Sequence, residues 1–130
     1  MTEVLAPFEA LIEKYASQFR IPPDWIRAII LTESSGNPNA KGPTGDYGLM
    51  QITVPTARAL GFTGHPDELF NPEINIWLGA RLLAEIQSRG ITTLPELYSA
   101  YNCGNPEEYK TNPIVARNVE HFLGYCGEAN

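Results

Sequence analysis

One glutamate stands out by its place in the sequence. Glu33 follows the apolar run Trp25–Leu31 and precedes a loop rich in glycine and proline. A carboxyl at the end of an apolar helix is partly removed from water, and burial raises its pKa because burial favours the neutral form. A carboxylic acid that stays protonated near neutral pH is what a general acid for glycoside cleavage requires. We therefore predict that Glu33 is an acid catalyst; the alternative is a solvated glutamate in a last helical turn.

The elements that must position Glu33 are predicted to be helices. Apolar residues recur at helical spacing from Phe8 to Phe19, and prolines at 22 and 23 start the next helix. Asn71 is a candidate N-cap for a longer helix ending near Gly90. Its predicted buried stripe is Ile74, Trp77, Leu78, Leu82 and Ile86. Further helices are predicted over residues 54–60, 94–101 and 113–123.

The remaining segments predict loops and very little sheet. Residues 36–46 are dense in turn formers and predict a surface loop, where binding groups are usually mounted. Only residues 51–54 are expected to pair briefly as a strand. We therefore expect an all-α or α-rich compact single domain over residues 1–130, with a substrate groove walled by loops.

Composition excludes several classes of partner. The net charge of -6 argues against nucleic-acid binding, so an anionic polymer would have to be held by shape, stacking and hydrogen bonds. Glu3 stands where a signal peptide carries bases, and no run of eighteen apolar residues follows. We expect no signal peptide and no membrane insertion.

The cysteines and histidines predict no metal site. Cys103 and Cys126 are too few for a disulfide scaffold, and neither His65 nor His121 lies at a ligand spacing from them. We expect no metal and no cofactor. A single bridge between the two cysteines stays open for an oxidising compartment.

Four motifs in order carry a resemblance to a known family. They are Glu33-Ser34-Ser35-Gly36, Gly48–Ile52, Asn71–Ile76 with Gly79, and Ala100–Asn102 followed by Gly104. Together they resemble the catalytic domain of soluble lytic transglycosylases, over roughly residues 20–125. That family has an α-rich lysozyme-like fold and is related to goose-type lysozymes. The resemblance implies cleavage of the β-1,4 bond between N-acetylmuramic acid and N-acetylglucosamine in peptidoglycan.

The resemblance also implies a mechanism with one carboxyl group. Glu33 would protonate the bridging oxygen, and the acetamido group of the substrate would stabilise the positive charge at the anomeric carbon. Glu33, then ionised, would take a proton from the 6-hydroxyl as that oxygen attacks. The product would carry a 1,6-anhydromuramoyl end.

By the same resemblance, residues of the second motif would contact the sugar. Gly48 would let the backbone pass close to the sugar, or would be a plain turn glycine. Gln51 would hydrogen-bond acetamido and hydroxyl groups, unless its amide packs against the loop. Met50 would line the groove, or fill the core. Thr53 stands where some members have a methionine or a polar residue that helps bind sugar.

Tyr101 and Asn102 stand where the family orients the acetamido group and the reacting sugar; the alternative for Tyr101 is a core tyrosine with its hydroxyl satisfied. The sequence also departs from the family pattern. Nine residues past Glu33, where members often carry a serine that hydrogen-bonds the glutamate, this chain has Gly42. Support for Glu33 would then come from the backbone, Thr44 or water.

Two other functions stay open. A goose-type lysozyme would hydrolyse the same bond with a second carboxylate, and Asp46 is the only acid in the loop before Gly48. A non-catalytic peptidoglycan-binding piece of a virion or secretion apparatus is the other. We expect a monomer, free or within a phage or secretion assembly. It would reach the cell wall or periplasm by phage delivery, holin-type release or a secretion apparatus.

Overall fold

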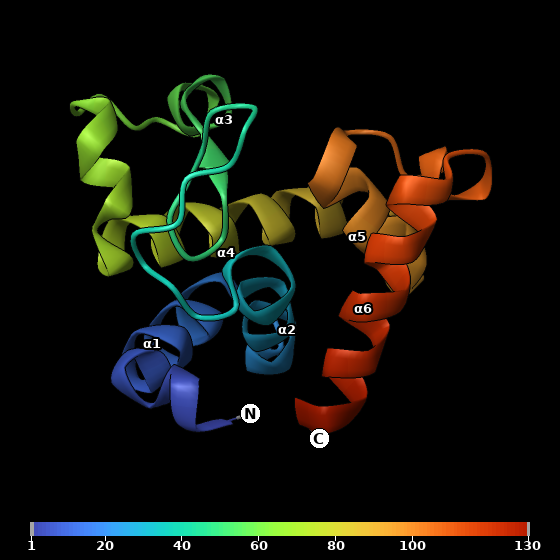
Figure 1. The fold of residues 1–130 in the computed structure, drawn as a ribbon, viewed down its shortest axis with the longest axis horizontal. Helices are drawn as coiled ribbons and strands as arrows, with labels where there is room; N and C mark the ends of the chain where they lie inside the picture. Colours follow the sequence, from blue (N-terminus) through green and yellow to red (C-terminus); the bar gives the residue numbers. More distant parts are fainter. Residues whose placement is uncertain (1, 130) are drawn as a thin grey trace.

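Helix α4 (Pro72–Ser88) lies in the middle of the fold. The computed structural model describes residues 2–129. Figure 1 shows α4 crossing the middle of the molecule, with α1 and α2 on one side, α3 on the other, and α5 at its far end. The remaining helices are α1 (Glu9–Phe19), α2 (Pro23–Ser34), α3 (Val54–Ala59), α5 (Leu94–Cys103) and α6 (Pro113–Ala129). Three 3-10 helices join them, η1 (Thr2–Phe8), η2 (Pro66–Phe70) and η3 (Glu108–Lys110). The predicted α-rich fold is confirmed.

The predicted buried stripe of α4 is only partly correct. Leu78 and Ile86 are buried, but Ile74, Trp77 and Leu82 are half-buried. The other buried residues of the helix are Asn75, Ile76, Gly79, Ala80 and Leu83. The buried residues of α4 do not form a single stripe because the helix is covered on most of its surface. It packs against α1, α2, α5, η2 and the small sheet.

Local sequence signals predicted where α2 and α4 begin. Asn71 caps α4, because its side-chain oxygen accepts hydrogen bonds from the backbone N–H groups of Glu73 and Ile74. Pro23 occupies the first turn of α2, where a missing N–H leaves no partner unsatisfied. The predicted starts of α2 and α4 are therefore confirmed by cap geometry, whereas α5 and α6 extend beyond their predicted ends at residues 101 and 123, to Cys103 and Ala129.

A two-stranded sheet closes the loop after α2. Strand β1 (Asp46–Tyr47) pairs antiparallel with β2 (Ile52–Thr53), with Asp46 opposite Thr53. The pairing expected near residues 51–54 is confirmed. The loop prediction for residues 36–46 was wrong at its last residue, because Asp46 belongs to β1.

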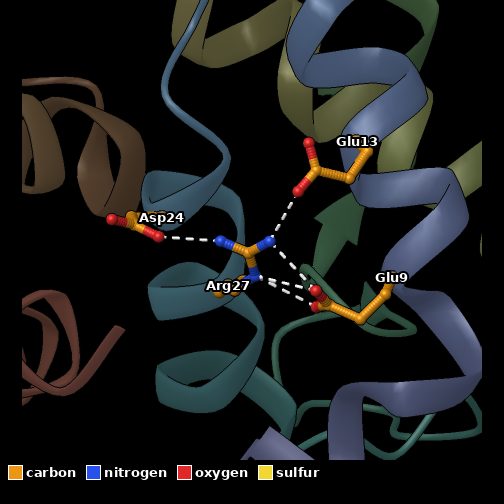
Figure 2. Close-up of polar contacts among 4 residues, drawn as sticks. All are labelled: Glu9, Glu13, Asp24 and Arg27. Carbon is orange, nitrogen blue, oxygen red and sulfur yellow. Dashed lines mark hydrogen bonds and ion pairs between the residues drawn. The ribbon is translucent and has the colours of Figure 1, made fainter. Parts of the chain in front are cut away.

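An arginine with three acidic partners joins α1 to α2 (Figure 2). The guanidinium of Arg27 donates to both carboxylate oxygens of Glu9 at 2.9–3.1 Å, to Glu13 at 2.8 Å and to Asp24 at 2.7 Å. Its hydrogen bonds with Glu9 are the main reason that the pKa of Arg27 is raised. Because only 16% of the Arg27 side chain is exposed, these contacts fix how α1 lies on the helix that ends at Glu33.

Both cysteines are free, Cys103 exposed and Cys126 buried, so the structure holds no bridge between them. Within residues 2–129 no group of three or more histidine, cysteine or acidic side chains has the arrangement of a metal site. Over the same residues, every helix is too short or too polar to cross a membrane.

Candidate active site

The carboxyl group of Glu33 is largely buried in the last turn of α2. Burial raises its pKa to about 7; the hydroxyl of Tyr98 opposes this rise and the charge of Asp46 adds to it. The expected burial of Glu33 is confirmed. A carboxyl with this pKa is partly protonated at neutral pH, so it can both give and accept a proton there.

A tyrosine that the sequence analysis did not select holds this carboxyl group. The hydroxyl of Tyr98, from α5, donates to Oε2 of Glu33 at 2.5 Å. Burial is the main reason that the pKa of Tyr98 is raised, so its hydroxyl stays protonated and acts as a donor. Among the described residues no hydrogen bond to Oε1 of Glu33 is formed, which leaves that oxygen for a substrate.

Glu33 opens onto a pocket of about 140 Å³, which we call the catalytic pocket. Three separate regions of the sequence contribute to it: the end of α2, the segment from Thr44 through β1 to the turn before β2, and the end of α5. Its lining residues are Glu33, Thr44, Asp46, Gln51, Tyr101 and Asn102. The lining is mostly polar, which suits a ligand rich in hydroxyl and amide groups.

The side chain of Asp46 lines this pocket and does not point into open solvent. It accepts a hydrogen bond from the hydroxyl of Thr44 at 2.8 Å, and its charge raises the pKa of Glu33. Thr44 was one of three expected sources of support for Glu33, beside the backbone and water, but its hydroxyl donates to Asp46. The hydroxyl that supports Glu33 comes instead from Tyr98.

Gly42 packs tightly against two residues of the pocket lining. A Cβ atom at this position would lie 2.6 Å from Oδ2 of Asp46 and 2.7 Å from Oε1 of Gln51. A serine at this position would have to displace both side chains. Glycine at position 42 therefore leaves the space that the side chains of Asp46 and Gln51 occupy.

Gln51 lines the catalytic pocket but uses its amide nitrogen internally. Nε2 donates to the carbonyl oxygens of Gly48 at 2.9 Å and Ala40 at 3.2 Å, as the packing alternative stated. Among the described residues no donor reaches Oε1, so this oxygen is the group of Gln51 that can receive a hydrogen bond from a sugar.

Two residues of the Gly48–Ile52 motif face the interior instead of the groove. Gly48 is buried at φ +74°, and a Cβ atom there would lie 2.7 Å from Nδ2 of Asn75 and 2.8 Å from the carbonyl oxygen of Leu69. Glycine is required by the close packing against α4, and not by the approach of a sugar. Met50 is fully buried, with its side chain against Gly79, so it fills the core.

Tyr101 and Asn102 both line the pocket, in different ways. The Tyr101 hydroxyl donates to the carbonyl oxygen of Met50 at 2.7 Å, so it is satisfied within the protein. Asn102 is exposed, and its Nδ2 lies 3.5 Å from the hydroxyl oxygen of Tyr98. This Nδ2 donates to the Tyr98 hydroxyl, so the amide oxygen and the second N–H of Asn102 remain for a ligand, close to the tyrosine that holds Glu33.

Thr53 lies outside the lining of the catalytic pocket. Its hydroxyl caps α3 by accepting from the backbone N–H of Thr56 and donating to the hydroxyl of Thr56. A cap residue at the end of β2 has its hydroxyl occupied by the helix. The structure thus places Thr53, like Gly48 and Met50, outside the pocket lining that contains the other residues selected on the sequence.

Sequence reasoning missed Tyr98 and Asn75. Tyr98 is three residues before Tyr101, a spacing that places both rings on one face of α5, and this was the available signal. Asn75 is completely buried and holds the loop by three hydrogen bonds, to Met50 N–H and to the carbonyl groups of Tyr47 and Leu69. A polar residue inside an apolar helix was its signal.

The sequence matches the family model described as "Transglycosylase SLT domain" over residues 10–115. Among curated proteins, it is 38% identical over 109 residues to membrane-bound lytic murein transglycosylase F of Salmonella arizonae, covering 78% of this chain and 20% of that protein. It is 40% identical over 83 residues to endo-type membrane-bound lytic murein transglycosylase A of Salmonella paratyphi B, covering 58% of this chain and 41% of that protein. The chain thus spans less than half the length of these relatives.

Two solved structures of lytic transglycosylases have a fold similar to that of this chain. The 70 kDa soluble lytic transglycosylase of Escherichia coli superposes with a TM-score of 0.86 at 26% identity, covering 96% of this chain and 24% of that one. An inactive mutant of the lytic transglycosylase Slt of Pseudomonas aeruginosa gives 0.83 at 22% identity, with the same coverage. The expected lysozyme-like fold is confirmed by this similarity.

Proposed function

Because this chain belongs to the transglycosylase SLT domain family, we propose that it is a peptidoglycan lytic transglycosylase with Glu33 as its single acid and base. It cleaves the β-1,4 bond between N-acetylmuramic acid and N-acetylglucosamine and leaves a 1,6-anhydromuramoyl end. The observation that carries the proposal is a buried glutamate of pKa about 7 that opens onto a polar pocket. The similar proteins described above are lytic murein transglycosylases, which supports murein as the substrate.

In the first step, Oε1 of Glu33 gives its proton to the bridging oxygen while Tyr98 keeps the other carboxylate oxygen in place. The C1–O bond breaks, and the acetamido oxygen of the substrate stabilises the positive charge at C1. Asn102 and the free oxygen of Gln51 line the pocket and are suited to orient the sugar.

In the second step, the 6-hydroxyl of the same sugar attacks C1 and its proton passes to Glu33. The carboxylate is then an anion in a buried place, and the Tyr98 hydroxyl stabilises it. Burial thus stabilises the protonated carboxyl that acts as the acid in the first step. The Tyr98 hydroxyl stabilises the carboxylate that acts as the base in the second step. No water molecule is consumed.

Digestion of purified sacculi tests this proposal directly. Products are identified by mass, because an anhydro product is one water lighter than a hydrolysed one. We expect anhydro products from the wild type and none from Glu33→Gln, which keeps the size of the side chain. Unchanged wall clearing by Glu33→Gln would overturn the proposal and favour a non-catalytic peptidoglycan-binding role.

A second candidate function is hydrolysis with Asp46 as a water-activating base. The observation in its favour is that Asp46 lines the same pocket as Glu33. Digestion in water enriched in ¹⁸O separates the two functions, since only hydrolysis adds the label to the new chain end. We further propose that the protein acts as a monomer on the cell wall, either free or as a component of a phage or secretion assembly.

A further inference from the structure

Helix α6 packs against both helices that carry the hydrogen bond between Tyr98 and Glu33. Figure 1 shows α6 at one side of the molecule, and it contacts α2, which carries Glu33, and α5, which carries Tyr98. None of the described residues of α6 lines the catalytic pocket. An effect of α6 on the reaction must therefore pass through the side chains that it packs against α2 and α5.

Phe122 is the residue of α6 whose ring stacks on the ring of Tyr98. The two ring centroids are 5.1 Å apart and the ring planes make an angle of 25°. Both side chains are buried, and Phe122 is completely so. The ring of Tyr101 is a second neighbour of Tyr98 but lies farther away, with centroids 6.5 Å apart. Aromatic pairs at such distances stabilise one another beyond the burial of their surface, so Phe122 restricts how the Tyr98 ring lies.

The position of the Tyr98 ring decides where its hydroxyl lies. The hydroxyl is at the far end of the ring, so a tilt of the ring displaces it more than the ring atoms. A hydrogen bond weakens steeply as its distance and angle change. Within residues 2–129, the other hydrogen bond of this hydroxyl comes from Nδ2 of the exposed Asn102, at 3.5 Å. Polar contacts alone therefore fix the hydroxyl weakly, and packing on the ring must supply the rest.

We propose that Phe122 is a positioning residue for the reaction, which holds the Tyr98 ring so that its hydroxyl stays on the carboxyl of Glu33. This inference rests on the proposed function, since it names the residue that positions the partner of the proposed acid and base. Phe122 is too deeply buried to touch a substrate, so its effect on the reaction passes through Tyr98.

A purely structural role for Phe122 makes a different prediction. Loss of a buried aromatic ring lowers the stability of the core, which reduces the amount of folded enzyme but leaves the proton affinity of Glu33 unchanged. A positioning role changes that affinity, because the donor to the carboxylate is displaced. The ionisable groups that interact with Glu33 are Asp46, Tyr98 and Tyr101. Phe122 carries no charge, so its replacement removes none of these groups.

The first test is the pH–rate profile of Phe122→Leu on soluble glycan strands, with rates divided by the folded fraction from circular dichroism. We expect the limb on which the rate falls with increasing pH to move to higher pH, as for Tyr98→Phe, and kcat to fall roughly fivefold. KM should change by less than about twofold, because Phe122 lies outside the pocket lining. Phe122→Met, which fills more of the space, should move the limb in the same direction if the leucine variant does not fold.

Combination with Tyr98→Phe separates the two roles. The Tyr98→Phe variant already lacks the hydroxyl, so adding Phe122→Leu should neither move the limb nor lower kcat further. Phe62→Leu is the matched control, because Phe62 is also buried and lies outside the lining of the catalytic pocket, and we expect it to leave the limb in place. An equal loss of kcat in both backgrounds, or the same shift for Phe62→Leu, overturns the inference.

The second test measures the Glu33 carboxyl without any cleavage. Its titration is followed by NMR in protein with ¹³C-labelled glutamate, and its signal is assigned by its absence in Glu33→Gln. We expect the midpoint for Phe122→Leu to lie at higher pH than for the wild type. An unmoved midpoint overturns the inference even where anhydro products are released. A moved midpoint together with hydrolysed products supports the role of Phe122 and rejects the transglycosylase proposal alone.

Discussion

The hydroxyl of Tyr98 donates to the carboxyl of Glu33 at 2.5 Å, and this contact joins residues 65 positions apart. It is the only hydrogen bond to the Glu33 carboxyl among residues 2–129, and it stabilises the anionic form against the effect of burial. In the proposed mechanism the same carboxyl group acts as an acid and then as a base, so its two protonation states need to be close in free energy. Tyr98 and burial together provide this balance.

Tyr98→Phe is expected to raise the pKa of Glu33 above about 7, because the donor that stabilises the anion is lost. Activity needs protonated Glu33 in the first step, so the limb on which the rate falls with increasing pH should move to higher pH. The maximal rate should fall roughly tenfold, because a carboxyl of higher pKa is a weaker acid for the first step and the anion which that step leaves is no longer stabilised. A pH–rate profile on sacculi measures both, with Tyr125→Phe on α6 as control; an unmoved limb would contradict the assignment.

Asp46→Asn is expected to shift the same limb in the opposite direction. Removing the negative charge of Asp46 lowers the pKa of Glu33, so the rate should begin to fall at lower pH than in the wild type. Under the transglycosylase proposal the variant still releases anhydro products, measured by mass. Loss of all cleavage in Asp46→Asn, together with hydrolysed products from the wild type, would favour hydrolysis instead.

Glu33→Gln is expected to be more stable than the wild type at alkaline pH. The folded pKa of Glu33, about 7, lies above its ordinary value of 4.5, so the folded state binds more protons between these values and the free energy of unfolding falls as pH rises through that window. The gain should be about 2–3 kcal/mol at pH 8 and close to zero at pH 4. Urea unfolding at both pH values measures it, with the exposed Glu85→Gln as control. A difference in the free energy of unfolding that is independent of pH would show that the pKa of Glu33 is not raised in the folded protein.

Asn75→Ala is expected to destabilise the fold and loosen the loop that carries Asp46 and Gln51. Three buried backbone groups lose their hydrogen-bond partner, which should lower the free energy of unfolding by about 3–5 kcal/mol. Thermal and urea unfolding measure the loss, and Asn118→Ala on α6 serves as control. A loss near that of the control would mean that Asn75 does not hold this loop.

The sequence by itself determined the helical architecture and the place of Glu33. Apolar spacing, Asn71 and the paired prolines specify helices and their ends through contacts within a few residues, so local patterns were sufficient. The burial of Glu33 followed in the same way, because the residue directly continues an apolar helix that the core must cover.

Only the tertiary structure decided which groups surround that glutamate. Tyr98 reaches Glu33 from another helix, Asn75 holds the loop from α4, and Phe122 of α6 stacks on Tyr98. In the sequence, the spacing of Tyr98 to Tyr101 indicates a shared helix face but no contact with Glu33, and Gly48 is indistinguishable from a turn glycine. Their roles depend on atoms brought together by packing between distant segments, and local residue patterns carry no information on these distances.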